Sequence, residues 1–128
     1  MDNLVFCFTD DHLASDGKKM RLGENLYHIV AHGESDGITV FGVKMSADEL
    51  AKIIRKRNDY KGQEIALIGC SMGDDRNGEP FASHLAKRMG VEVIAATRVL
   101  WTDGTKDYII SSKAFDGRPD GKFKKFRG

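Results

Sequence analysis

Four short apolar runs, each bounded by glycine, aspartate or asparagine, constrain the fold of this chain more than any other feature of its sequence. They are residues 4–8, 26–31, 65–68 and 91–96. Runs of this length without alternating polar residues are typical of strands that are covered on both faces, as the strands of parallel sheets are. The runs therefore predict the centre of a mostly parallel sheet.

Two segments with helical periodicity lie between these runs. In the first, Ser46 and Glu49 have the spacing of a capping box. In the second, Pro80 marks the first turn and Gly90 lies just past the end. Strands that alternate with helices imply parallel strands joined by right-handed crossovers, and hence a layered α/β domain. The apolar stripes of the two predicted helices are Leu50, Ile53 and Ile54, and Phe81, Leu85 and Met89.

The end of the chain departs from this alternation. Segments 99–101 and 108–110, joined around an Asp-Gly pair, predict a closing hairpin. The tail 113–128 is basic, and we expect a solvated terminal segment. It also contains three aromatic residues, Phe115, Phe123 and Phe126. These indicate that part of the tail packs back on the domain.

Size and charge limit the classes of protein. The chain has 128 residues and is 41% hydrophobic, which is enough for one core, so we expect a single domain over 1–128. A net charge of +1 argues against a dedicated nucleic-acid binder. No apolar run is long enough to cross a bilayer, so we expect a soluble domain without a membrane span. Cys7 and Cys70 lie in separate apolar surroundings and are expected to be free thiols.

Two strand ends carry side chains that suit chemistry. Ligands of a parallel α/β sheet collect beyond the carboxyl ends of its strands. The run 26–31 is followed there by His32, and the run 65–68 by Gly69 and Cys70. If these two strands are neighbours, the imidazole and the thiol can meet.

Together these groups predict a minimal hydrolytic site. A thiol attacks a carbonyl as the thiolate, and a nearby imidazole can lower its pKa, take its proton and then protonate the departing amine. Gly33 permits close approach of a substrate to the backbone. The amides of Gly33 and Cys70 are candidate hydrogen-bond donors to the oxyanion that develops in such a reaction.

At these residues the chain resembles the clan CD cysteine peptidases, the caspase-like group that includes the self-processing protease domains of large bacterial toxins. The resemblance is carried by His32 and Cys70 at successive strand ends and by the intervening segments 41–42 and 46–50. The chain is also similar to C-terminal effector domains of polymorphic bacterial toxins. In these domains a strand that ends in cysteine precedes a helix with the pattern Phe-Ala-x-x-Leu-Ala, which is present here at residues 81–86.

The resemblance implies a caspase-like three-layer α/β/α sandwich with a mostly parallel central sheet and a C-terminal hairpin. It implies that His32 is the general acid/base, that Cys70 is the nucleophile, and that the amides of Gly33 and Cys70 form the oxyanion hole. It also implies that Thr97 and Arg98 line the specificity pocket. Arg98 suits an acidic substrate side chain, but it can equally pair with a local carboxylate.

The same resemblance implies a protein or peptide substrate, no cofactor, and a cognate immunity protein. It describes a domain of a secreted bacterial toxin that acts in the cytosol of the target cell. Toxin proteases of this group are activated by an inositol phosphate at a basic surface, to which the tail is similar. Residues 71–75 differ from the caspase motif. A Cys-dependent deamidase or transacylase and a non-catalytic interaction module therefore stay open as alternatives.

Several weaker signals in the sequence have ordinary structural explanations. Residues 69–73 match the Gly-x-Ser-x-Gly nucleophile elbow of a serine esterase, with Ser71 as nucleophile, but the later His84 lies on the helix close behind. His28 and His32 lack the neighbouring ligands of a metal site, and Cys7 suits the core. Ordinary polar loops account for Asp10, Asp11, His12, Asp74 and Asp75, of which the last two are alternatively partners of His32 or of a basic substrate.

Overall fold

The computed structural model of this chain describes most of the region that carries the predicted strands and helices. The described residues are 4–7, 25–34, 37–40, 43–69, 71–76, 78–98, 100–102, 108–110 and 121–127. Within these ranges none of the helices is long and apolar enough to cross a membrane.

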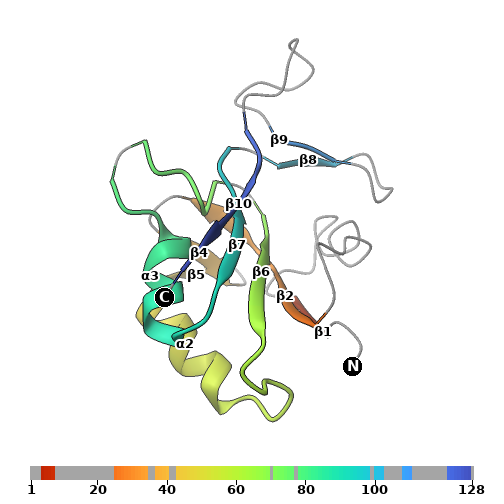
Figure 1. The fold of residues 1–128 in the computed structure, drawn as a ribbon, viewed down its shortest axis with the longest axis vertical. Coiled ribbons are helices and arrows are strands. Elements are labelled where there is room, and N and C mark those ends of the chain that lie inside the picture. Colours follow the sequence, from red (N-terminus) through yellow and green to blue (C-terminus); the bar gives the residue numbers. More distant parts are fainter. Residues whose placement is uncertain are drawn as a thin grey trace.

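A five-stranded sheet in the order β1-β2-β6-β7-β10 forms the centre of the molecule (Figure 1). The four predicted apolar runs are confirmed as its four parallel strands, which pair in the order in which they occur along the chain. Their continuous apolar character has the expected cause, since β2 and β7 are buried along their whole length. The strands are β1 (Leu4–Cys7), β2 (Leu26–Val30), β6 (Glu64–Ile68), β7 (Val93–Ala96) and β10 (Phe123–Phe126).

The last strand, β10, corrects the expectation of a solvated tail. It pairs antiparallel with β7 and lies at the edge of the sheet, with Phe126 opposite Val93. Phe126 is buried and Phe123 packs on the opposite face, which confirms for these two residues that the aromatic part of the tail packs back on the domain. The sequence Phe-Lys-Lys-Phe had concealed this strand, because its two phenylalanines are three residues apart and face opposite sides of the sheet, without the alternation typical of a half-buried strand.

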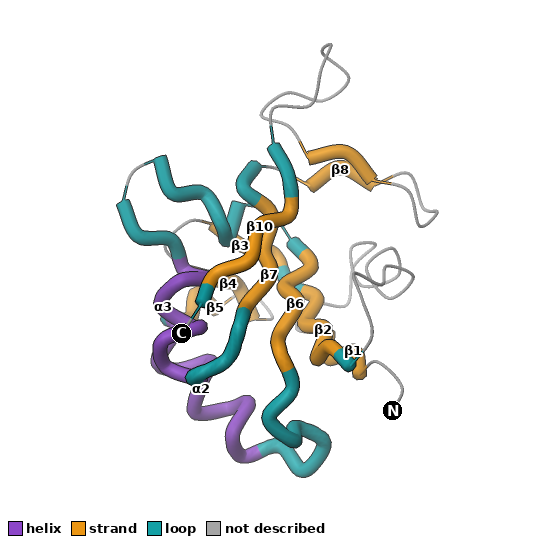
Figure 2. Tube along the Cα trace, in the orientation of Figure 1, coloured by secondary structure: helices purple, strands orange, loops and turns teal. Residues whose placement is uncertain are grey.

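Two helices, α2 (Ala47–Lys56) and α3 (Phe81–Met89), lie side by side on one face of this sheet (Figure 2). The predicted caps are confirmed, because Ser46 Oγ accepts a hydrogen bond from the Glu49 amide at 3.3 Å and Gly90 has a φ of 68°. Both apolar stripes face the sheet, with Leu50, Ile54, Phe81 and Leu85 fully or almost fully buried.

The opposite face of the sheet carries a second apolar cluster. Leu26, Ala66 and Ile94 form it with Phe123, and the fully buried His28 lies on the same strand as Leu26. Within the described ranges, no helix covers this face. The molecule is therefore a mixed α/β domain with a mostly parallel sheet, and the third layer of the expected sandwich stays a prediction.

Two small antiparallel sheets complete the described structure. β8 (Leu100–Thr102) pairs with β9 (Tyr108–Ile110), which confirms the predicted hairpin pairing, although the turn around Asp103 and Gly104 lies outside the described residues. The other sheet consists of β3 (His32–Glu34), β4 (Gly37–Val40) and β5 (Val43–Met45). This meander was not predictable from the sequence, since strands of three or four residues with polar and glycine positions make no apolar run.

A polar cluster closes the loop that follows α2 at the amino end of the sheet. The hydroxyl of Tyr27 donates to Asp59 Oδ1 at 2.9 Å and accepts from Arg57 Nε at 2.7 Å. Arg57 Nη2 and Asp59 Oδ2 form an ion pair at 2.8 Å, and the Tyr60 ring packs edge-on against Tyr27. Burial, together with the hydrogen bond to Asp59, raises the pKa of Tyr27 to about 12.

Candidate functional site

The carboxyl ends of β2 and β6 lie side by side. In the parallel register Val30 is opposite Ile68, and the Ala31 amide donates to the Ile68 carbonyl oxygen at 3.0 Å. His32 follows Val30 by two residues and Cys70 follows Ile68 by two residues. The condition on which the predicted site depended, that these strands be neighbours, is therefore met.

Two glycines hold the chain segments beyond these strand ends in close contact. A β-carbon on Gly69 would overlap the carbonyl oxygen of Ala31, so only glycine fits there without movement of the backbone. A β-carbon on Gly33 would lie 2.5 Å from Cγ of Met72. Met72 is fully buried and also touches the space beside Gly69, so its side chain lies between the two segments.

His32 is exposed and opens strand β3 instead of ending β2. The chain passes from one sheet to the other between these residues. Ala31 still donates a hydrogen bond to β6, whereas His32 pairs with Thr39 of β4. Cys70 itself lies outside the described residues, whereas its neighbours Gly69 and Ser71 are described. The structure thus brings together the segments that carry the two predicted catalytic residues and describes one of the two side chains.

Ser71 begins a tight turn in a conformation that is rare for non-glycine residues, with a φ of 58°. Its amide donates to the carbonyl oxygen of Arg98 at 3.0 Å, and its own carbonyl oxygen accepts from the Asp74 amide at 3.0 Å. The Ser71 amide is therefore committed to the end of β7. Of the amides at this strand end, this one is not available to an oxyanion.

Thr97 and Arg98, the predicted specificity residues, lie just after β7 on the same side of the sheet. Thr97 is buried, its amide donates to the Lys122 carbonyl oxygen at 2.9 Å, and its hydroxyl oxygen accepts from the Lys122 amide at 3.0 Å. Arg98 Nη1 donates to the Thr97 carbonyl oxygen at 2.7 Å and lies 3.5 Å from Asp74 Oδ1. Pairing with a local carboxylate, one of the two interpretations of Arg98, is thus present in the structure.

Asp74 is the residue of this region whose role sequence reasoning misjudged. The expectation of a solvated turn is wrong, because the Asp74 carboxylate is buried and its side chain is only 9% exposed. Arg76 Nη2 donates to Oδ2 at 2.6 Å and Arg76 Nε to Oδ1 at 3.0 Å, so the guanidinium is the main partner. These hydrogen bonds, with Arg98 nearby, hold the pKa of Asp74 below its usual value. An acidic residue two positions before an arginine in one loop was the available signal.

The neighbouring Asp75 does face solvent, as expected of a loop. Its Oδ2 lies 3.1 Å from Nζ of Lys124 on β10. That hydrogen bond lowers the pKa of the Asp75 carboxyl. Neither Asp74 nor Asp75 forms a hydrogen bond or ion pair with His32 among the interactions described, and the alternative in which one of them orients the imidazole stays a prediction.

The histidines and remaining acidic residues do not form a second site in the described ranges. His28 is fully buried within β2, whereas His32 is exposed on β3, so the two do not share an environment. Within the described residues, no three His, Cys, Asp or Glu side chains gather closely enough to hold a metal ion. Other residues discussed above also lie outside those ranges, namely Asp10, Asp11, His12, Phe115 and the segment 41–42, and the Cys7 side chain is likewise not described.

Comparison with known proteins identifies one family. A family model described as "Domain of unknown function (DUF8616)" matches residues 2–124. A search of the curated proteins found no match.

Proposed function

The chain belongs to the DUF8616 family of domains of unknown function, and we propose that it is a cysteine-nucleophile hydrolase in which Cys70 and His32 form a catalytic dyad. The reaction is acyl transfer, with a protein or peptide as the substrate. The fold proposed with this chemistry is the caspase-like α/β/α sandwich, and the mostly parallel sheet with two helices on one face is compatible with it.

One observation carries the proposal, namely that the segments bearing the two residues touch. Val30 and Ile68 are paired across β2 and β6, and the contact continues one step further between Ala31 and Gly69. Neighbouring strands are about 4.8 Å apart. At this spacing, side chains two residues beyond the paired ends can be brought within hydrogen-bond reach by rotation, and the proposal requires His32 and Cys70 to meet in this way.

The chemistry follows the order of a thiol hydrolase. His32 removes the proton from the Cys70 thiol, and the thiolate sulfur forms a bond to the substrate carbonyl carbon. The imidazolium of His32 then returns that proton to the leaving amine as the carbon–nitrogen bond breaks, and water later hydrolyses the acyl-enzyme. The amides of Gly33 and Cys70 stabilise the oxyanion, since the Ser71 amide is already bonded to Arg98.

The proposal extends to the context that the resemblance suggests. The domain acts as an effector or processing domain of a secreted bacterial toxin, and it is active in the cytosol of the target cell. In the strain that produces the toxin, a cognate immunity protein blocks it. Thr97 and Arg98 contact the substrate side chain. An inositol phosphate is the candidate activator, and the described basic residues of the tail are Lys122, Lys124, Lys125 and Arg127.

The direct test compares the two thiols of the folded protein. Treatment with limiting iodoacetamide, followed by mass spectrometry of the peptides, should modify Cys70 at least about tenfold faster than Cys7, because only a thiol with a depressed pKa is rich in thiolate at neutral pH. His32→Ala should remove most of this difference, whereas His84→Ala, which alters an exposed histidine on α3, should not. Equal slow labelling of both cysteines in the wild-type protein would contradict the proposal.

A serine esterase is the second candidate, and the positive φ of Ser71 favours it, since the nucleophile elbow places its serine on a strained turn. Two observations weigh against it. In an elbow the helix follows the nucleophile directly, whereas α3 begins only at Phe81. His84 lines a hollow of about 250 Å³ between α2 and α3, and Ser71 is not one of its lining residues. Loss of activity on Ser71→Ala, with Cys70→Ala fully active, would favour the esterase.

A further inference from the structure

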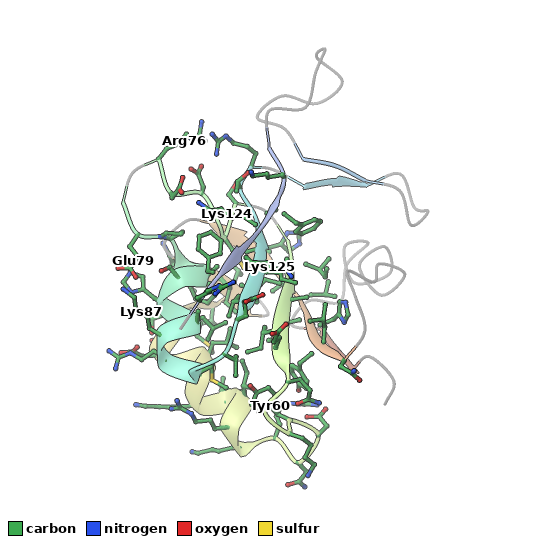
Figure 3. All side chains as sticks on the ribbon, in the orientation of Figure 1. Tyr60, Arg76, Glu79, Lys87, Lys124 and Lys125 are labelled. Carbon is green, nitrogen blue, oxygen red and sulfur yellow. The ribbon has the colours of Figure 1, made fainter. Side chains whose placement is uncertain are left out.

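We propose that the C-terminal strand β10 positions the loop that follows Cys70, so that Lys124 and Phe126 act as positioning residues for the thiol. This inference rests on the proposed function, since it concerns the reactivity of Cys70. The loop comprises the residues from Gly69 to Arg76, and we call it the nucleophile loop. Figure 3 shows that Arg76 and Lys124 lie toward the same end of the sheet, away from Tyr60.

The first contact between β10 and the nucleophile loop is apolar. A β-carbon on Gly73 would lie 2.9 Å from Cε2 of Phe126, so the loop backbone packs directly on that ring. On the other side Gly73 meets the end of β7, where its amide donates to the Ala96 carbonyl oxygen at 2.8 Å. The Phe126 ring is buried and belongs to the main core, which gives this contact a fixed base.

The second contact is an ion pair. Lys124 Nζ lies 3.1 Å from Asp75 Oδ2 and 5.4 Å from the centre of the Phe126 ring. One lysine thus connects the loop carboxylate with the aromatic ring on which the loop backbone rests. Its neighbour Lys125 pairs instead with Glu92, just before β7 at the amino end of that strand, at 3.6 Å.

The nucleophile loop depends on such contacts because none of its described residues belongs to a helix or strand. The next described helix, α3, begins at Phe81, and the Ser71 backbone is held in a conformation that few non-glycine residues adopt. Toward β2 the loop is held by Gly69 and Met72, and toward β7 by the bond from Ser71 to Arg98. α3 holds it through the Ala82 amide, which donates to the Met72 carbonyl oxygen at 2.9 Å. β10 supplies two further contacts from about fifty positions later in the chain, Phe126 against Gly73 and Lys124 against Asp75.

The test measures the rate at which iodoacetamide modifies Cys70 between pH 5 and 9, with Cys7 as the internal reference. Lys124→Ala should slow labelling of Cys70 about threefold at neutral pH and move its profile to higher pH. Lys125→Ala removes the same charge from the same strand without touching the loop, and it should leave the profile unchanged. The double variant Lys124→Asp with Asp75→Lys should restore the wild-type profile.

Phe126 provides a second and stronger test. Phe126→Leu keeps an apolar contact and should retain most of the reactivity, whereas Phe126→Ala should reduce it about tenfold or more, because small displacements of a reacting group are costly. A urea unfolding curve for each variant shows whether it is folded under the labelling conditions. If Phe126→Ala is unfolded, the test uses Phe126→Leu and Lys124→Ala instead.

The outcomes separate the two proposals. If Cys70 of the wild-type protein reacts fast and the Lys124 and Phe126 variants match it in rate and pH profile, the role of β10 is overturned and the proposed function stands. If Cys70 of the wild-type protein is no more reactive than Cys7, the proposed function fails and the inference fails with it. Slow labelling in Lys124→Ala and Lys125→Ala alike would also overturn the inference, because a general charge effect would then explain it.

Discussion

The backbone of Gly69 packs against the carbonyl oxygen of Ala31 so closely that no β-carbon fits between them. This contact joins the two strand ends at the step before His32 on one side and Cys70 on the other. It depends on a backbone atom, which cannot rotate away as a side chain can. The geometry of the candidate site is therefore sensitive to a single added methyl group.

Gly69→Ala should destabilise the domain by about 3 kcal/mol or more, because the strand ends must separate to admit the methyl group. The free energy of unfolding in urea measures this loss. Gly62→Ala is the matched control, since Gly62 has open space around it and only its φ of 86° opposes the change. That control should cost about 1–2 kcal/mol. Equal losses in the two variants would mean that the contact with Ala31 is relaxed in solution.

Gly33→Ala and Met72→Ala should be strongly coupled, because the Met72 side chain occupies the position that a β-carbon on Gly33 would take. Met72→Ala alone should cost about 2–5 kcal/mol as a truncation in a closed core. In that background the added cost of Gly33→Ala should fall below its cost in the wild-type protein by about 1 kcal/mol or more. A double-mutant cycle by urea denaturation measures the coupling, and additive effects would contradict the contact.

Asp74→Asn should destabilise the domain by about 2–4 kcal/mol, since it leaves Arg76 and the largely buried Arg98 without their carboxylate partner. The pKa of Asp74 is lowered by folding, so its stabilisation is complete above the usual aspartate pKa of 3.8 and is lost as the pH falls through the lower folded value. The difference in stability between wild type and Asp74→Asn should therefore shrink below about pH 4. Asp75→Asn is the exposed control, and acid titration of the urea midpoint is the measurement.

Tyr27 should make the domain sensitive to high pH. Its pKa is raised to about 12 in the folded protein, so its contribution is fully present below the unfolded value near 10 and is lost between pH 10 and 12. A two-unit difference corresponds to about 2–3 kcal/mol. Urea midpoints measured from pH 9 to 12 should fall in the wild-type protein and fall less steeply in Tyr27→Phe. Parallel curves would show that another group titrates.

Expression in bacteria tests the effector role that the resemblance suggests. The wild-type domain should inhibit growth of its host, and Cys70→Ala and His32→Ala should each relieve that inhibition, because each removes one half of the proposed dyad. Cys7→Ala is the control thiol substitution and should stay inhibitory. Colony counts after induction, with protein levels matched by immunoblotting, give the comparison. Equal growth inhibition by wild type and Cys70→Ala would favour a non-catalytic interaction module.

Much of the fold was predictable because local patterns and tertiary structure agree. Apolar runs such as 65–68 are continuous because both faces of a central parallel strand are covered, and a run of consecutive apolar residues is recognisable in the sequence. The cap at Ser46 and the glycine at position 90 act within one helical turn, so the ends of the helices can also be predicted from a few neighbouring residues. The candidate dyad was predictable for the same reason, since both residues lie within two positions of the end of a recognisable apolar run.

Tertiary structure decided the features whose partners are distant in the chain. β10 has the sequence Phe-Lys-Lys-Phe, which has no strand periodicity, and only its pairing with β7 buries Phe126. Asp74 has its main partner, Arg76, in its own loop, but its burial also brings it beside Arg98 at the end of β7, and that second partner is distant in sequence. By itself the sequence determined the parallel sheet, its helices and the residues at its strand ends, through patterns that act over a few residues. The contacts that hold the nucleophile loop join segments far apart in sequence, and no local pattern encodes which of them meet.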